Sequence, residues 1–400
     1  MRGEQILFDA FKRALAGESR CIIAFRHSSG AEPQLLTWFF LYRLKALAAA
    51  KGVRFARKPH ALFVYGYEVA RWGGWLARLI MPNLGAMPIH HSKIDTRGMA
   101  RIYRAIVEDS LPLALAPEGQ VSYTADSIPR LEPGIVRIGF QAAERLTANN
   151  VNIPVEILPV SIHKRYNSGA QAAAERLLRK IEKLCGFSRK TYAHLPWTER
   201  LGRCRDYLLG INEARYNIKS DTALSFEERL EHVINTALET AERMLGIKST
   251  GDYFARLYKV RQVCWDRIYL PGMDNFKRTP YAERNLMDMT AGEAWYITRH
   301  QELADFCWYF RCPLPTEKTA LHNKIEYIQN LWDFANRTMG GALANRINIH
   351  PCTVIIQTAL PIDLSGQLRR YKADKKAVID EKVSELEKAY NNCINDINSM

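Results

Sequence analysis

The sequence predicts an α/β fold with a largely parallel central sheet flanked by helices, interrupted by a large helical insertion. Short apolar runs alternate with amphipathic segments up to about residue 165, which is typical of parallel strands covered by helices. Strand signals nearly vanish from about residue 168, and the run Val354–Ile356 then predicts a return to the sheet. We therefore expect an α/β core (1–167), a helical insertion or subdomain (168–350), and a returning strand with a C-terminal helix (351–400).

The first region alternates helices and strands. It begins with a helix over residues 4–16, because Ile6, Leu7 and Phe11 recur at helical spacing. The apolar run Cys21–Phe25 then predicts a buried strand. We expect further strands at 61–65, after a turn at 85–88, at 111–116 and at 153–162, and further helices at 33–51, 98–109 and 134–147.

The second region is expected to be helical. Its clearest helix start is at Ser225, where Glu228 follows three residues later and completes a capping box. The expected helices are 170–185, 198–215, 225–246, 251–269, 283–310 and 317–338. A terminal helix at 366–394 is expected after the returning strand.

Composition narrows the class of protein. The chain has 400 residues, of which 47% are hydrophobic, so it can bury a large core. Its net charge of +14 favours an anionic partner such as a membrane surface, an acidic carrier protein or a phosphorylated substrate. No nucleic-acid motif or basic tail is evident, so we predict no nucleic-acid partner. Eight scattered cysteines without a Cys-x-x-Cys pair, and no secretory signal, favour free thiols and a cytoplasmic location.

Two apolar and aromatic segments bear on membrane association. No stretch reaches 18 uninterrupted apolar residues, so no transmembrane helix is predicted. Leu35–Tyr42 and Trp72–Met81 combine aromatic and aliphatic residues with nearby Arg or Lys. Each segment is either a core helix or an interfacial membrane segment.

His27 and Glu32 are the first candidates for chemistry. His27 follows the strand at 21–25 and lies in a Ser/Gly loop, a common way to hold a base at the edge of a cleft. Glu32 comes five residues later, so its carboxylate can return to the imidazole and fix its tautomer. The alternatives are a structural loop histidine and an acid favoured by the helix dipole.

Glu118 and Gly119 mark a second loop. They follow the predicted strand Leu113–Ala116, after Pro117. The intervening strands and helices would bring this loop and the His27 loop to one end of the sheet. The alternative for Glu118 and Gly119 is an ordinary turn.

Four stretches of the sequence stand out together: 26–32, 84–89, 116–121 and 153–162. In this order they resemble the sequence blocks of the glycerophospholipid acyltransferase family, of the 1-acylglycerol-3-phosphate acyltransferase type. The family has Asp where this chain has Glu32, and Thr-Arg where this chain has Gln120 and Val121. The family usually has an Arg at the position of His90-His91.

The resemblance implies an enzyme that moves a fatty acyl group from acyl-CoA or acyl carrier protein to a lipid hydroxyl, such as that of a lysophospholipid. It would work peripherally on the cytoplasmic side of an anionic membrane surface. His27 would be the base and Glu32 its partner, with no Ser or Cys nucleophile. The residues assigned to substrate binding are Glu118, Gly119, Ser28, Ser29, Lys93 and Arg97.

Acyl transfer also needs hydrogen-bond donors that stabilise the oxyanion. Backbone amides at Ser28–Gly30 are candidate donors to the oxyanion. No cofactor is implied. We also predict no metal site, because adjacent residues on a strand, such as His90 and His91, point to opposite faces and chelate poorly.

Two other functions use the same residues. A catalytically degenerate protein of this fold would bind lipid or a partner without turnover. A hydrolase would use the dyad to activate water and would release free fatty acid without an acceptor. Turnover with and without an acceptor separates the three.

Overall fold

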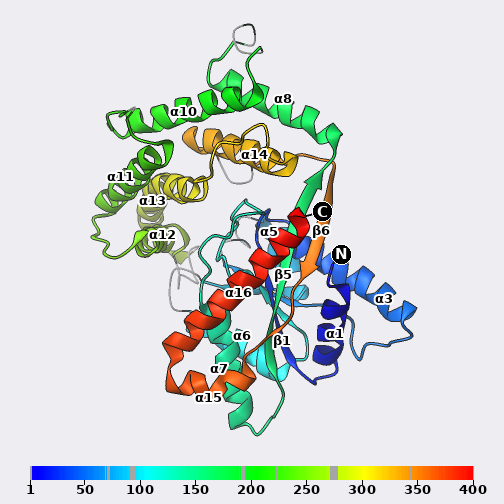
Figure 1. Cartoon of the computed structure of the whole chain (residues 1–400). Helices are drawn as coiled ribbons and strands as arrows, with labels where there is room; N and C mark the ends of the chain where they lie inside the picture. Colours follow the sequence, from blue (N-terminus) through cyan, green and yellow to red (C-terminus); the bar gives the residue numbers. More distant parts are fainter. Residues whose placement is uncertain are drawn as a thin grey trace. The chain divides into compact units, whose positions relative to one another are not determined.

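The chain divides into two compact units (Figure 1). The structure is a computed structural model, and it describes residues 2–67, 69, 73–90, 95–188, 190, 194–221, 223–270, 278–341 and 345–399. One unit is Met1–Arg165 with Thr353–Met400, and the other is Tyr166–Cys352. The chain leaves the first unit at the end of one strand, β5, and re-enters it at the start of another, β6.

A seven-stranded sheet, counted over the described residues, forms the first unit. Its order is β3-β2-β4-β1-β5-β6, with β7 paired to β5. Four pairings are parallel and the β5–β7 pairing is antiparallel, so the predicted α/β fold with a mostly parallel sheet is confirmed. The strands are β1 (Arg20–Phe25), β2 (Leu62–Gly66), β3 (Met87–Ile89), β4 (Leu113–Leu115), β5 (Val155–Tyr166), β6 (Cys352–Thr358) and β7 (Ile362–Asp363).

The register places β1 between β4 and β5. Ile22 lies opposite Leu113 on one side and Ile157 on the other. Near the carboxyl end of the strand, Ala24 lies opposite Leu115, the last residue of β4. The loops that follow β1 and β4 therefore leave the same edge of the sheet, as parallel strands require.

Side chains of β1 alternate between two cores, one on each face of the sheet. Cys21, Ile23 and Phe25 belong to a core with α1 (Glu4–Leu15) and α2 (Glu32–Trp38). Ile22 and Ala24 belong to the other core, with α6 (Thr96–Glu108), α7 (Gly134–Ala148) and α16 (Lys375–Asn398). Period-two alternation thus buries both faces of the central strand.

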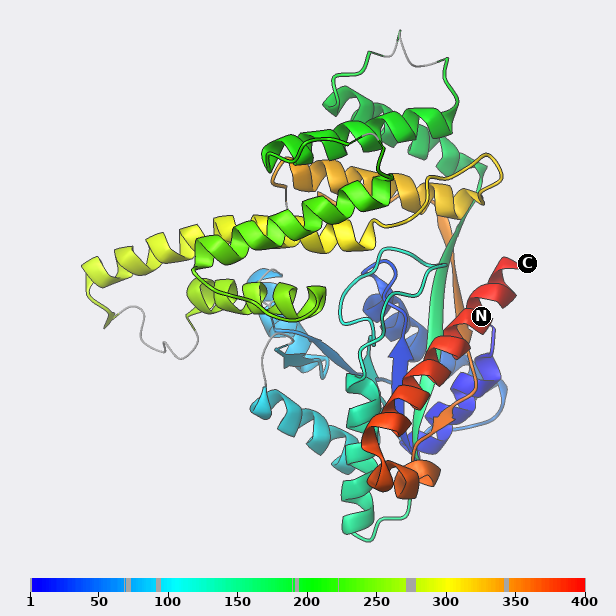
Figure 2. The same cartoon turned by 60° about the vertical axis from the view of Figure 1, so that its left-hand side comes forward.

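Helix α16 lies along the sheet in both views (Figures 1 and 2). Its buried Tyr390 donates a hydrogen bond to the carbonyl oxygen of Ala24 at 2.9 Å. The helix is thereby fixed to the carboxyl end of β1, just before the His27 loop.

Two expected helices of this unit are divided. The helix expected at 33–51 runs as α2, a π-helical turn η1 (Phe39–Leu44) and α3 (Lys45–Ala50). The helix expected at 366–394 is divided into η4 (Ser365–Gln367), α15 (Leu368–Ala373) and α16. It breaks at Asp374, whose carboxylate accepts from the amide of Ala377 at 3.0 Å and starts α16 afresh.

The second unit is built from helices over the described residues. The predicted capping box is confirmed: Ser225 Oγ accepts from the Glu228 amide, and Glu228 Oε2 accepts from the Ser225 amide. The helices are α8 (Ser168–Leu184), α10 (Trp197–Arg215), α11 (Phe226–Leu245), α12 (Tyr253–Tyr269), α13 (Tyr281–Tyr309) and α14 (Leu321–Thr338).

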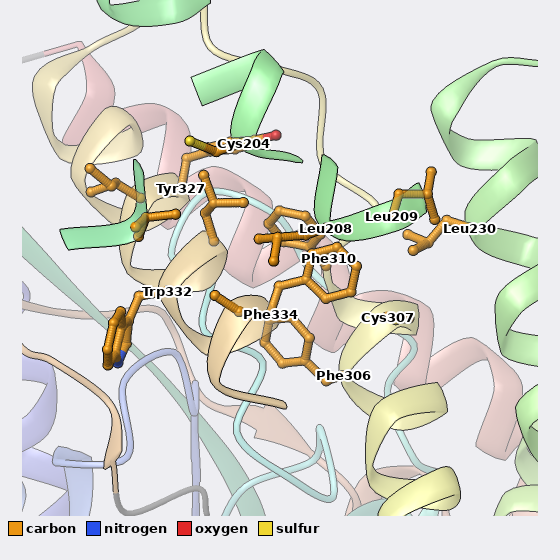
Figure 3. Packing of buried hydrophobic residues seen from close by; sticks show 14 of the residues in the cluster. Cys204, Leu208, Leu209, Leu230, Phe306, Cys307, Phe310, Tyr327, Trp332 and Phe334 are labelled. Atoms are coloured by element: carbon orange, nitrogen blue, oxygen red, sulfur yellow. The ribbon is translucent and has the colours of Figure 1, made fainter. Parts of the chain in front are cut away.

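This unit has its own hydrophobic core (Figure 3). The rings of Phe306 in α13 and of Phe310, the residue that caps this helix, pack against Phe334 from α14, with centroids 6.2 and 5.3 Å away. Leu208 and Leu230 extend the core to α10 and α11. All eight cysteines of the chain are free and six are buried, which confirms the predicted free thiols.

The two apolar segments differ in burial. In Leu35–Tyr42, Phe39 and Phe40 are buried, whereas Trp38 and Tyr42 are exposed, so only one side packs in the core. In the other segment, α5 (Gly74–Asn83) has no buried residue, and core packing is the wrong interpretation for its described part. No helix among the described residues combines the length and apolar character needed to cross a bilayer.

Candidate functional site

His27 lies two residues beyond the end of β1, on the loop that leads to α2. Its imidazole packs edge-on against Phe25, with ring centroids 5.8 Å apart, and its side chain is 20% exposed. Gly30 turns the loop in the left-handed region (φ 81°), which glycine adopts without steric cost. The turn brings Glu32, the first residue of α2, back to His27.

The hydrogen bond expected from the spacing of His27 and Glu32 is present. The Nδ1 atom of His27 lies 2.9 Å from Oε2 of Glu32, whose side chain is fully buried. Burial alone would raise the pKa of Glu32, but the hydrogen bond and the charge of His27 reverse this and leave that pKa below its usual value. When the imidazole is neutral, Nδ1 donates its proton to the ionised Glu32, and Nε2 carries the lone pair.

Ser28 and Ser29 support the carboxylate. Ser28 Oγ lies 3.3 Å from Oε1 of Glu32 and 3.1 Å from the carbonyl oxygen of Ile162 in β5. Its single hydroxyl proton is within reach of both acceptors, so Ser28 lies between the dyad and β5. Ser29 helps to lower the pKa of Glu32, after the larger effects of burial and of His27.

Glu118 lies in the loop after β4 and is 2% exposed. Its Oε1 atom accepts hydrogen bonds from Arg26 Nε and, at 3.2 Å, from the backbone amide of His27. Its Oε2 atom is buried and has no hydrogen-bond partner among the described residues. Gly119 follows with φ 72°, a left-handed turn that reverses the chain after the carboxylate.

The two loops are joined through their backbones. The amide of Ser122 donates to the carbonyl oxygen of His27 at 2.9 Å. The base of the second loop is closed where the Glu132 amide donates to the carbonyl oxygen of Pro117 at 2.7 Å. The prediction that both loops meet at one edge of the sheet is confirmed.

Arg26 and Ser122 belong to the site although their sequence context did not identify them. Arg26 is 1% exposed and Ser122 is fully buried. The available sequence signal was the alternation of side chains along β1. If this alternation continues past Ala24, Arg26 points to the face of Ile22 and Ala24, and His27 points to the opposite face. Their partners lie about ninety residues away in the sequence, beyond the reach of a local pattern.

A second histidine lies beneath the site. His163 Nε2 is 2.7 Å from Ser161 Oγ, and its Nδ1 is 3.5 Å from Asp126. Burial lowers the pKa of His163, as does the charge of Arg26, and Asp126 only partly offsets this. Ser161 is fully buried, so this triad-like group is part of the interior and not an accessible nucleophile.

Of the two remaining predicted substrate residues, the structure describes Arg97, and it is not brought to the dyad. Arg97 is exposed in the first turn of α6, and no hydrogen bond or ion pair connects it with His27 or Glu32. Lys93 and His91 lie outside the described residues. Over the residues that the structure describes, no group of three or more His, Cys, Asp or Glu side chains could hold a metal ion.

None of the family models, curated proteins and solved structures with which the chain was compared matches it. A neutral imidazole held by a buried carboxylate at a strand end can remove a proton from a hydroxyl group or from water.

Proposed function

We propose that the protein is an acyltransferase that moves a fatty acyl group from a thioester, acyl-CoA or acyl carrier protein, to a lipid hydroxyl. The observation that carries this is the His27–Glu32 pair at the sheet edge, joined by hydrogen bonds to the loop of Glu118. The resemblance of four sequence blocks to glycerophospholipid acyltransferases supplies the substrate class.

His27 acts as the base in the proposed reaction. Its Nε2 removes the proton of the acceptor hydroxyl while the hydroxyl oxygen attacks the thioester carbonyl carbon. The tetrahedral intermediate collapses, the carbon–sulfur bond breaks, and the thiolate leaving group receives from His27 the proton that came from the acceptor hydroxyl. Glu32 holds the ring by Nδ1 and stabilises the imidazolium formed during the transfer.

Glu118 and the amides of the first loop have the remaining roles in this proposal. The side chain of Glu118 is fully buried, so it positions the acceptor indirectly, by holding the second loop and Gly119 against the backbone of His27. Three consecutive backbone amides donate no hydrogen bond to the described residues: those of Ser28, Ser29 and Gly30. They are the proposed donors to the oxyanion.

We further propose that the enzyme works at the cytoplasmic surface of an anionic membrane. Helix α5 exposes Trp75 (74%), Leu79 (57%) and Ile80 (43%), and the whole chain has a net charge of +14. An apolar helix surface together with positive charge is the combination that favours interfacial binding. Within the same proposal, residues 168–350 are an insertion into the acyltransferase core.

The first experiment measures transfer. The purified full chain would be incubated with long-chain acyl-CoA and lysophosphatidate or a membrane lipid extract, and the products read by mass spectrometry. We expect an acylated lipid that disappears in His27→Ala while the circular dichroism spectrum is unchanged. His232→Ala, which removes an exposed imidazole from α11, is the matched control and should keep full transfer.

Other outcomes contradict the proposal. Full transfer by His27→Ala removes His27 from the mechanism. Free fatty acid without any acylated lipid indicates a hydrolase that uses the same dyad. No product with any donor, including an acyl carrier protein, indicates a binding protein.

A further inference from the structure

Arg26 carries a fully buried guanidinium group beside the dyad. Its side chain is 1% exposed, whereas arginine is almost never fully buried unless it is paired. It extends to the same face of the sheet as Ile22 and Ala24, where the ring of Tyr390 lies 5.7 Å from the guanidinium carbon. His27, the next residue, packs against Phe25 on the other face.

The guanidinium binds one segment of the second loop at several points. Its Nη1 donates to the carbonyl oxygen of Ala125 at 3.2 Å, and its Nη2 donates to those of Thr124 and Ser127 at 3.1 and 2.8 Å. Its Nε donates to Oε1 of Glu118. Only the planar fork of arginine can make these four bonds together.

The same loop holds the backbone of His27. Glu118 Oε1, which binds Arg26, also accepts from the His27 amide, and Ser122 donates to the His27 carbonyl oxygen. Tyr123, between Ser122 and the segment bound by Arg26, has a left-handed backbone (φ 56°). A bulky residue keeps that conformation only where its surroundings impose it.

We propose that Arg26 is a positioning residue for His27: its guanidinium sets the conformation of residues 118–127, and that loop fixes the backbone that carries the catalytic imidazole. The catalytic consequence rests on the function proposed above. Arg26 is not itself catalytic, because its contacts are with Glu118, loop carbonyls and Tyr390 and not with the imidazole.

Arg26→Lys separates positioning from charge balance. Lysine keeps the positive charge beside Glu118, so a role limited to neutralising that carboxylate is retained. Its single ammonium group cannot replace the fork that binds Thr124, Ala125 and Ser127. The control is Arg13→Lys, because Arg13 also pairs with a glutamate in this unit: its Nη2 lies 2.6 and 2.9 Å from the two carboxylate oxygens of Glu156.

Two readouts follow. In Arg26→Lys we expect kcat for acyl transfer to fall by about 10- to 100-fold, while KM for the donor changes less than about threefold, because a misplaced base affects the chemical step. We also expect the amide hydrogens of His27 and Ser122 to exchange with solvent at least about tenfold faster. Arg13→Lys should leave kcat and these two exchange rates unchanged.

The exchange measurement keeps this inference separate from the proposed function. If the wild-type protein transfers no acyl group, the proposed function fails, yet the exchange rates still decide whether Arg26 holds the loop. If Arg26→Lys does not fold, Arg26→Met with Glu118→Gln replaces it, because that pair leaves no unpaired buried charge. Wild-type exchange at His27 and Ser122 in the folded variant would overturn the inference.

Discussion

At the residue scale, one imidazole is controlled from two loops. Glu32 fixes its ring through Nδ1, while Glu118 and Ser122 fix its backbone amide and carbonyl groups. Ring and backbone are held by separate partners, so a substitution can loosen one without the other. Variants of Glu32 should change the protonation of the dyad, and variants of Arg26 its placement.

The lowered pKa of Glu32 predicts a pH-dependent contribution to stability. Folding stabilises the ionised form of Glu32 relative to the unfolded chain, in which a glutamate has a pKa of about 4.3. This contribution is complete above about pH 5 and is lost as the pH falls through the lower pKa of the folded state. We expect the excess stability of the wild type over Glu32→Gln to shrink as the pH falls from about 5 to 3.

Denaturant unfolding of both proteins at several pH values measures this difference. Glu387→Gln, which neutralises an exposed acid on α16, is the control for a general change in charge. A difference between wild type and Glu32→Gln that stays constant with pH would show that Glu32 is not held in its ionised form.

Local spacing was sufficient to predict the dyad but not its support. His27 and Glu32 are five residues apart on either side of one turn. Their geometry is therefore determined by where β1 ends and where α2 begins. Arg26 depends on Glu118, 92 residues away, and on three carbonyl groups of the same distant loop. Sequence periodicity does not predict such contacts, because they form only when the parallel strands bring two distant loops to one edge of the sheet.

At the element scale, helices were predicted better than their interruptions. The strand and helix order of the first unit follows from apolar periodicity, which is a property of each segment alone. The π-helical segment Phe39–Leu44 buries Phe39, Phe40 and Leu44. These spacings also fit an α-helix, so the sequence gives no separate signal for the wider π-helical turn. The break at Asp374 does have a sequence signal, because an aspartate before a helical segment is a common N-cap. The apolar pattern nevertheless continues across Asp374 and hides the break.

Helix α5 makes the membrane proposal testable. Replacing Trp75 and Leu79 together by alanine should weaken binding to vesicles that contain anionic phospholipid by about tenfold or more, because both side chains contribute apolar area. The melting temperature should not change, since neither side chain is buried in the fold. Co-sedimentation with vesicles measures the binding.

Trp295→Ala provides the matched control for this helix. It removes a similarly exposed tryptophan (54%) from α13 in the other unit. If Trp295→Ala weakens vesicle binding as much as the α5 variant does, the effect is not specific to α5. Unchanged binding by the α5 variant would show that this helix does not dock on the membrane.

At the scale of the whole molecule, the chain has two units with separate cores. Residues Tyr166–Cys352 are continuous in sequence and enclose the cluster around Phe310 and Phe334. Since no residue of this cluster comes from the first unit, we expect residues 166–352 expressed alone to fold. Circular dichroism should show a helical spectrum and a cooperative thermal transition, and a spectrum of unfolded chain would contradict this.

The bond between Tyr390 and Ala24 joins positions that are 366 residues apart. A ribosome makes β1 to β5 first, then the second unit, and only afterwards the helix that carries Tyr390. While the second unit is made, the growing chain already contains His27, Glu32 and Glu118, but it lacks the aromatic ring that packs against Arg26. The order of translation therefore delays completion of the site, and a polypeptide interrupted before α16 carries the reactive residues without their final support.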